Sequence, residues 1–142
     1  GRWATLFSMV EALVVLDETA AAAKLYPLVR WCAQRTGTVA LMQPDGRLVE
    51  RTAGMAAAAG SNWETAEGHF TTALDQAHTL PHRPEQAHTR RFYAAMLLRR
   101  SGPGDTNRAY QFLAEAETLY GAMGMPKHVE ITRALRQQRP GQ

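Results

Sequence analysis

The histidines are the side chains in this sequence best suited to hold a metal ion, but their spacing does not favour a metal site. His78 and His82 are four residues apart, with Pro81 between them. A helix does not continue through that proline, so the two imidazoles cannot share one helical face. His88 follows further along, and no cysteine or carboxylate lies at ligand spacing. We therefore expect no metal and no cofactor.

The nucleophiles and glycine-rich segments do not predict catalysis either. Cys32 is the single cysteine, which excludes an internal disulfide, and we interpret it as a small packing residue. No Ser-His-Asp or Cys-His arrangement can be argued from the sequence. Asp45-Gly46 and the segment 102–105 are rich in turn residues, but neither follows a strand or carries the lysine of a phosphate loop. We expect a protein that is not an enzyme.

The basic residues are concentrated in two segments of a chain whose net charge is only +3. The first holds Arg90, Arg91, Arg99 and Arg100, and the second holds Arg133, Arg136 and Arg139. We interpret these segments as solvated helix faces, and the alternative is nucleic-acid binding. Nucleic-acid binding needs a wider basic stripe interleaved with aromatic residues, so we do not expect it.

Composition and periodicity predict an all-α protein of 142 residues. The strongest pattern lies in 62–79, where Asn62 can cap a helix and Ala66, Phe70 and Ala73 recur at helical spacing. Further helices are predicted at 2–16, 17–34, 46–59, 85–100, 105–122 and 126–138. The second of these should break near Ala23–Tyr26, because Pro27 removes a backbone hydrogen bond.

The connecting segments are predicted from turn chemistry. Residues 36–47 fit no helix, and 38–42 is interpreted as an extended apolar connector, because a lone strand there would have no partner. The prolines of 80–84 predict a linker. Asp105 or Thr106 is expected to cap the helix that follows the Ser101–Asp105 turn. The single cysteine and the lack of a long apolar run favour a cytoplasmic protein without a membrane segment.

Two of these helices share a packing pattern. Ala66, Phe70 and Ala73 align with Ala109, Leu113 and Ala116, and Gly54 of the preceding helix aligns with Ala94. An alanine, a large apolar residue and a second alanine at this spacing are typical of the second helix of a tetratricopeptide repeat. We predict a single domain over 1–142, with antiparallel helical hairpins at 2–34, 46–79 and 85–122 and a closing helix at 126–138. Its hairpins are expected to stack as a right-handed superhelix.

The segment 46–126, and more weakly the first hairpin, resembles the C-terminal repeat region of large bacterial signalling ATPases, in which an adenylate-cyclase or DNA-binding output domain precedes a nucleotide-binding switch and a helical array. The resemblance is carried by Ala66/Phe70/Ala73, by the RRSGPGD turn at 99–105 and by GMP at 124–126. It implies a fragment of a longer protein involved in signalling or transcription regulation. The phosphate loop, the cyclase residues and the helix-turn-helix of such a parent are not in this sequence, so their activities are not transferred.

The inner face of such a superhelix is the expected binding surface, formed by the first helix of each hairpin. It should carry Arg51, Met55, Ala58, His88, Arg91, Ala95, Leu98 and Arg99. Arginines above an apolar floor suit an acidic peptide, a terminal carboxylate or another domain of the parent protein. We expect a non-catalytic protein–protein interaction module. The alternative is a small-molecule effector site that controls a parent ATPase or cyclase.

The helix at 2–16 has a wide apolar face that something must cover. A preceding hairpin of the parent or a second copy of this chain, forming a homodimer through the N-terminal hairpin, would do so.

Overall fold

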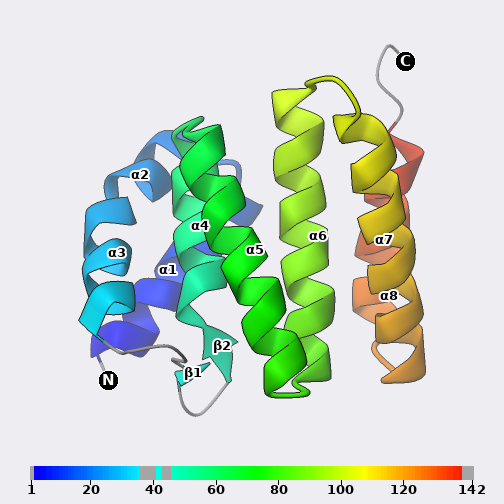
Figure 1. Ribbon diagram of the computed structural model, residues 1–142, viewed down its shortest axis with the longest axis horizontal. Helices are drawn as coiled ribbons and strands as arrows, with labels where there is room; N and C mark the ends of the chain where they lie inside the picture. The colour runs from blue at the N-terminus through cyan, green and yellow to red at the C-terminus, as the bar shows by residue number, and fades with distance from the viewer. Residues whose placement is uncertain (1, 36–40, 43–45, 139–142) are drawn as a thin grey trace. The chain divides into compact units, whose positions relative to one another are not determined.

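The computed structural model describes residues 2–35, 41–42 and 46–138, and over these residues it confirms the all-α class. The elements, shown in Figure 1, are α1 (Arg2–Val15), α2 (Thr19–Lys24), α3 (Tyr26–Arg35), β1 (Leu41–Met42), β2 (Arg47–Leu48), α4 (Val49–Ala59), α5 (Trp63–Thr79), α6 (Arg83–Arg100), α7 (Asp105–Ala122) and α8 (Pro126–Gln137). They divide into two compact units, Gly1–Gln76 and Ala77–Gln142. The superhelical stacking stays a prediction.

Helix α4 is the centre of the first unit. Every residue of α4 except Glu50 is buried, and the helix packs against α1, α2 and α3. Its alanines permit this crowding, because a methyl side chain lets neighbouring backbones approach closely. The antiparallel neighbour α5 places Phe70 over Gly54, where a Cβ atom would lie 2.9 Å from the ring. The glycine therefore makes the space that the aromatic ring fills.

The predicted break in the second helix is confirmed. Helix α2 ends at Lys24 and α3 begins at Tyr26, which places Pro27 in the first turn of α3. The first turn of a helix has backbone N–H groups without intrahelical partners, so a proline there costs little.

The expectation that an extended segment near residue 40 would lack a partner is wrong. β1 pairs antiparallel with β2, with Leu41 opposite Leu48 and Met42 opposite Arg47. The partner comes from residues predicted to begin the next helix, which instead starts at Val49. The rest of the connector prediction falls on 36–40 and 43–45, outside the described residues.

The second unit consists of α6, α7 and α8, which run in alternating directions (Figure 1). Helix α7 packs against both neighbours. Its buried residues follow one stripe: Asp105, Ala109, Leu113, Ala116 and Tyr120. Helix α6 begins two residues before the predicted position, because Pro84 fits the first turn and His82 caps it by accepting a hydrogen bond from the Glu85 N–H.

Asp105 does not cap α7 as predicted. The N-cap position is taken by Gly104, whose φ of 80° suits a residue without a side chain. Asp105 is the first helical residue, and its carboxylate turns back to accept hydrogen bonds from the Gly102 N–H and from Arg100.

Candidate functional site

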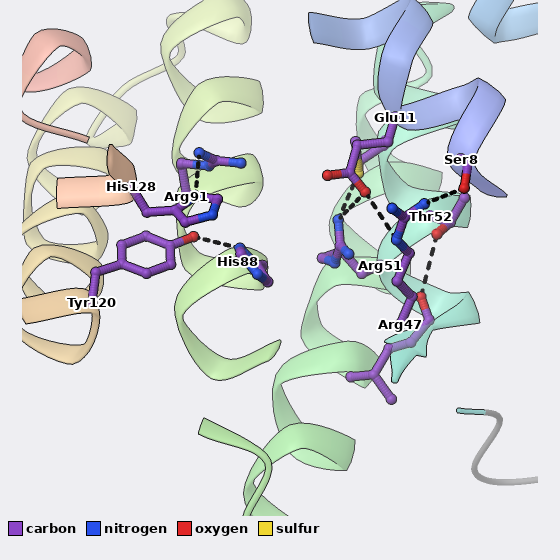
Figure 2. A network of polar contacts seen from close by, with 11 residues as sticks. Ser8, Glu11, Arg47, Arg51, Thr52, His88, Arg91, Tyr120 and His128 are labelled. Atoms are coloured by element: carbon purple, nitrogen blue, oxygen red, sulfur yellow. Dashed lines mark hydrogen bonds and ion pairs between the residues drawn. The ribbon is translucent and has the colours of Figure 1, made fainter. Parts of the chain in front are cut away.

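The two predicted groove residues of the first unit, Arg51 and Met55, are buried, with exposures of 1% and 2%. Arg51 Nη1 lies 3.3 Å from the Met55 sulfur and 3.5 Å from Glu11 Oε2, and Arg47 bonds Ser8 beside it (Figure 2). A buried guanidinium needs such partners, because removing its charge from water costs free energy that ion pairs and hydrogen bonds must offset. This burial differs from the prediction that the two residues line an open groove, and Ala58 is buried as well.

In the second unit, His88 and Arg91 of α6 meet residues of α7 and α8. His88 Nδ1 lies 2.6 Å from the Tyr120 hydroxyl, and Arg91 Nη1 lies 3.3 Å from His128 Nδ1 (Figure 2). The Tyr120 and His128 rings stack with centroids 4.9 Å apart. Because a guanidinium only donates, Arg91 is the donor of this contact and His128 Nδ1 is the acceptor. We interpret this cluster as a contact that joins the three helices.

The remaining predicted groove residues lie further along α6. Leu98 and Ala95 are half-buried and Arg99 is exposed, whereas Arg91 is 6% exposed. His128 and Tyr120 were missed, because no local pattern relates residues on three different helices. In the described part of the chain, no group of three or more His, Cys, Asp or Glu side chains could hold a metal ion.

Most arginines of the two basic segments pair within the chain. Arg90 Nε lies 2.7 Å from Glu115 Oε2, and Arg100 Nε lies 2.7 Å from Asp105 Oδ2. Arg133 and Arg136 lie 2.6 and 2.5 Å from the Glu117 carboxylate. The hydrogen bond from Arg100 holds the pKa of Asp105 below its usual value, against the opposing effect of burial. The hydrogen bonds from Arg133 and Arg136 lower the pKa of Glu117 in the same way.

An aromatic and basic surface lies on α1 and α3, in the first unit. Trp3, Leu28 and Trp31 are 40%, 52% and 44% exposed. The two indole rings are 5.4 Å apart, and the Arg35 guanidinium lies 4.4 Å from the centre of the Trp31 ring. We call the surface formed by Trp3, Leu28, Arg30, Trp31 and Arg35 the α1–α3 face. The sequence indicated the apolar face of the first helix but not the aromatic pair, whose members lie far apart in the chain.

A shallow groove of about 340 Å³ adjoins this face and is lined by Tyr26, Pro27, Arg30, Trp31 and Gln34. The Tyr26 hydroxyl lies 3.0 Å from His69 Nε2, and His69 Nδ1 lies 2.5 Å from Glu50 Oε2. Burial raises the pKa of Tyr26, with a smaller lowering effect from Arg30 and a raising effect from Glu50. No sequence motif predicted this hydrogen-bonded series, because Tyr26, Glu50 and His69 lie on three different helices, α3, α4 and α5.

Cys32 is buried on α3, as the packing interpretation expects, and burial raises the pKa of its thiol. A raised pKa keeps the sulfur protonated and unreactive at neutral pH.

A larger groove of about 620 Å³ lies at the end of α7 and along α8. Its lining is Gly121, Gly124, Met125, Pro126, Val129, Glu130, Arg133, Ala134 and Gln137. Both its size and its mainly apolar walls are within the range of small-molecule sites.

Comparison of the chain with protein families, with characterised proteins and with solved structures found no significant match. Among the helices in the described ranges, none combines the length and apolar character that crossing a bilayer requires.

Proposed function

We propose that this chain is a non-catalytic protein-interaction module that binds an acidic, partly apolar segment of a partner protein on the α1–α3 face. The observation that carries the proposal is the exposure of Trp3, Leu28 and Trp31 beside two arginines. Tryptophan and arginine are the residues most enriched among those that dominate binding energy at protein interfaces.

The charge of this face selects the kind of partner. Helix α3 carries Arg30 and Arg35, both exposed, and no acidic residue. Acidic side chains on a partner would complement these cations, while apolar side chains would cover the indoles. By contrast, Arg51 is buried and bound to Glu11, so it is less suited to a partner than the sequence implied.

The biological setting of the proposal comes from the repeat pattern. The resemblance of 46–126 to the helical array of bacterial signalling ATPases favours a regulatory role in a longer signalling or transcription-regulating protein. Within such a protein, the partner segment can belong to another domain of the same chain.

Titration with an acidic amphipathic peptide tests this function. Reversing both charges, with Arg30→Glu and Arg35→Glu, should weaken binding by about tenfold or more, and Trp31→Ala should do so too. Arg83→Glu is the matched control, because Arg83 is exposed in the second unit. Equal affinities of the double variant and the control would show that the α1–α3 face is not the binding surface.

The alternative is a small-molecule effector site, which the groove of α7 and α8 favours. A metabolite bound there would raise the melting temperature through mass action. Ala134→Trp, which fills the groove, should abolish that stabilisation, whereas it should leave peptide binding on the α1–α3 face unchanged.

A further inference from the structure

Glu50, His69 and Tyr26 form a hydrogen-bonded chain that ends at the groove of the first unit. An ionised carboxylate only accepts hydrogen bonds, so the 2.5 Å contact from Glu50 places a proton on His69 Nδ1. In neutral His69 the other nitrogen, Nε2, is then an acceptor, and the Tyr26 hydroxyl donates to it over 3.0 Å. The proton of Tyr26 is thereby directed toward His69, and only the lone pairs of its oxygen remain for a ligand in the groove.

Protonation of His69 reverses the last bond of this chain. With both ring nitrogens protonated, Nε2 donates to the Tyr26 oxygen, and the hydroxyl proton turns away from His69. The charged or titratable groups placed against His69 are Glu50 from α4 and Tyr26 from α3. Arg30 lies one turn after Tyr26 and lines the same groove. The groove then offers two donors, a phenol and a guanidinium.

We propose that this groove binds a carboxylate with an adjoining aromatic or apolar group, held between the Arg30 guanidinium and the Tyr26 hydroxyl, and that binding takes up one proton at His69. The carboxylate pairs with Arg30, while the adjoining group packs on Trp31 and Pro27. The proton comes from solvent and resides on Nε2, where Glu50 balances its charge. The partner assignment rests on the proposed function, because the carboxylate is then an Asp or Glu side chain of the bound segment.

The site can be tested without the partner by using benzoate, followed by NMR titration of the whole chain. Imidazoles titrate between about pH 5 and 8, and uptake of one proton strengthens binding by up to tenfold per pH unit. Benzoate should therefore bind several-fold more tightly at about pH 6 than at about pH 8, with shifts at Tyr26, Arg30 and Trp31. Tyr26→Phe and His69→Gln should each remove this pH dependence.

The matched control is His78→Gln, since His78 lies in the second unit and contacts Arg90. This variant should keep the wild-type pH dependence. The inference is overturned if benzoate does not bind at the groove, binds equally at both pH values, or keeps its pH dependence in folded Tyr26→Phe. If benzoate behaves as expected but acidic peptides do not bind the α1–α3 face, the proposed function fails and the carboxylate site stands.

Discussion

At the scale of single residues, Gly54 shows how one missing side chain organises the first unit. The Phe70 ring is fully buried, and a Cβ on Gly54 would lie only 2.9 Å from it, closer than van der Waals contact allows. A buried aromatic ring cannot move aside cheaply, because protein interiors are packed as densely as crystals. The small residue on one helix and the aromatic residue on the next, both noted in the sequence, are therefore in direct contact in the structure.

Gly54→Ala should destabilise the protein by up to about 2 kcal/mol, because overpacking costs about 1–3 kcal/mol and the gain in helix propensity is only about 1 kcal/mol. Gly68→Ala is the matched control, since a Cβ there meets no atom within 4 Å. That substitution should stabilise α5 by up to about 1 kcal/mol. Urea unfolding of both variants measures the difference, and a stabilised Gly54→Ala variant would contradict the packing described.

Residue burial could be predicted where helical periodicity decides it and not where a distant partner does. Ala66, Phe70 and Ala73 are fully buried, as their spacing on the helix indicates. The sequence analysis predicted that Arg51 faces a binding groove, because the sequence does not show that Glu11, on another helix, pairs with it. The hydrogen bonds that link Glu50, His69 and Tyr26 could not be predicted for the same reason.

At the scale of elements, the turn between α6 and α7 is held by one carboxylate. Asp105 accepts hydrogen bonds from Arg100 and from the Gly102 N–H while its side chain is only 3% exposed. Hydrogen bonds to charged groups contribute about 1.5–3 kcal/mol each. The acidic residue after the glycines thus fixes the hairpin rather than capping the helix.

Asp105→Asn should lower the free energy of unfolding by about 1–3 kcal/mol at neutral pH. Because the folded-state pKa of Asp105 is lowered, its contribution is fully present above the unfolded value of about 3.9 and is lost as pH falls through the folded pKa. The difference between wild type and variant should therefore be constant near neutrality and shrink below about pH 4. A difference that does not change with acidification would show that the pairing is not responsible.

Glu117→Gln provides the comparison on a more exposed pair, which joins α7 to α8. Glu117 is 18% exposed, and its partners Arg133 and Arg136 are 63% and 43% exposed. Exposed ion pairs contribute about 0–1 kcal/mol and are screened by salt. Chemical denaturation should thus show a smaller, salt-sensitive loss than for Asp105→Asn, and a larger loss would contradict the argument from exposure.

The helices could be predicted from periodicity, proline and glycine, whereas the ribbon of β1 and β2 could not. Pro27 and Gly104 act through their own backbones, so their effects can be read locally. Strand pairing between Leu41 and Leu48 depends on residues that have too few alternations to give a pattern. For that reason the helix that begins at Val49 was predicted to begin three residues earlier, at residue 46.

At the scale of the whole molecule, the chain has two compact helical units, and each presents a different kind of surface. The first exposes aromatic residues and arginines on α1 and α3, and the second has an apolar groove along α8. Neither surface is the binding groove that the repeat pattern predicted, since that groove combined residues of α4 and α6. The arginines assigned to that groove were chosen by repeat position alone, and repeat position does not show which cations are paired.

Binding of an acidic peptide should weaken as salt rises, because Arg30 and Arg35 are exposed and their attraction is screened. An increase from about 0.05 to 0.5 M NaCl should reduce the affinity several-fold, measured by quenching of Trp fluorescence. The Arg30→Glu, Arg35→Glu double variant should lose this salt dependence. Affinity that is independent of salt in the wild type would indicate a purely apolar contact.

The most direct test of the proposed function is chemical-shift mapping of the whole chain during titration with an acidic amphipathic peptide. Binding on the α1–α3 face should produce the largest changes at Trp3, Leu28 and the Trp31 indole. Changes confined instead to His88, Arg91, Leu98 and Arg99 would contradict it and restore the groove that the repeat pattern alone had suggested.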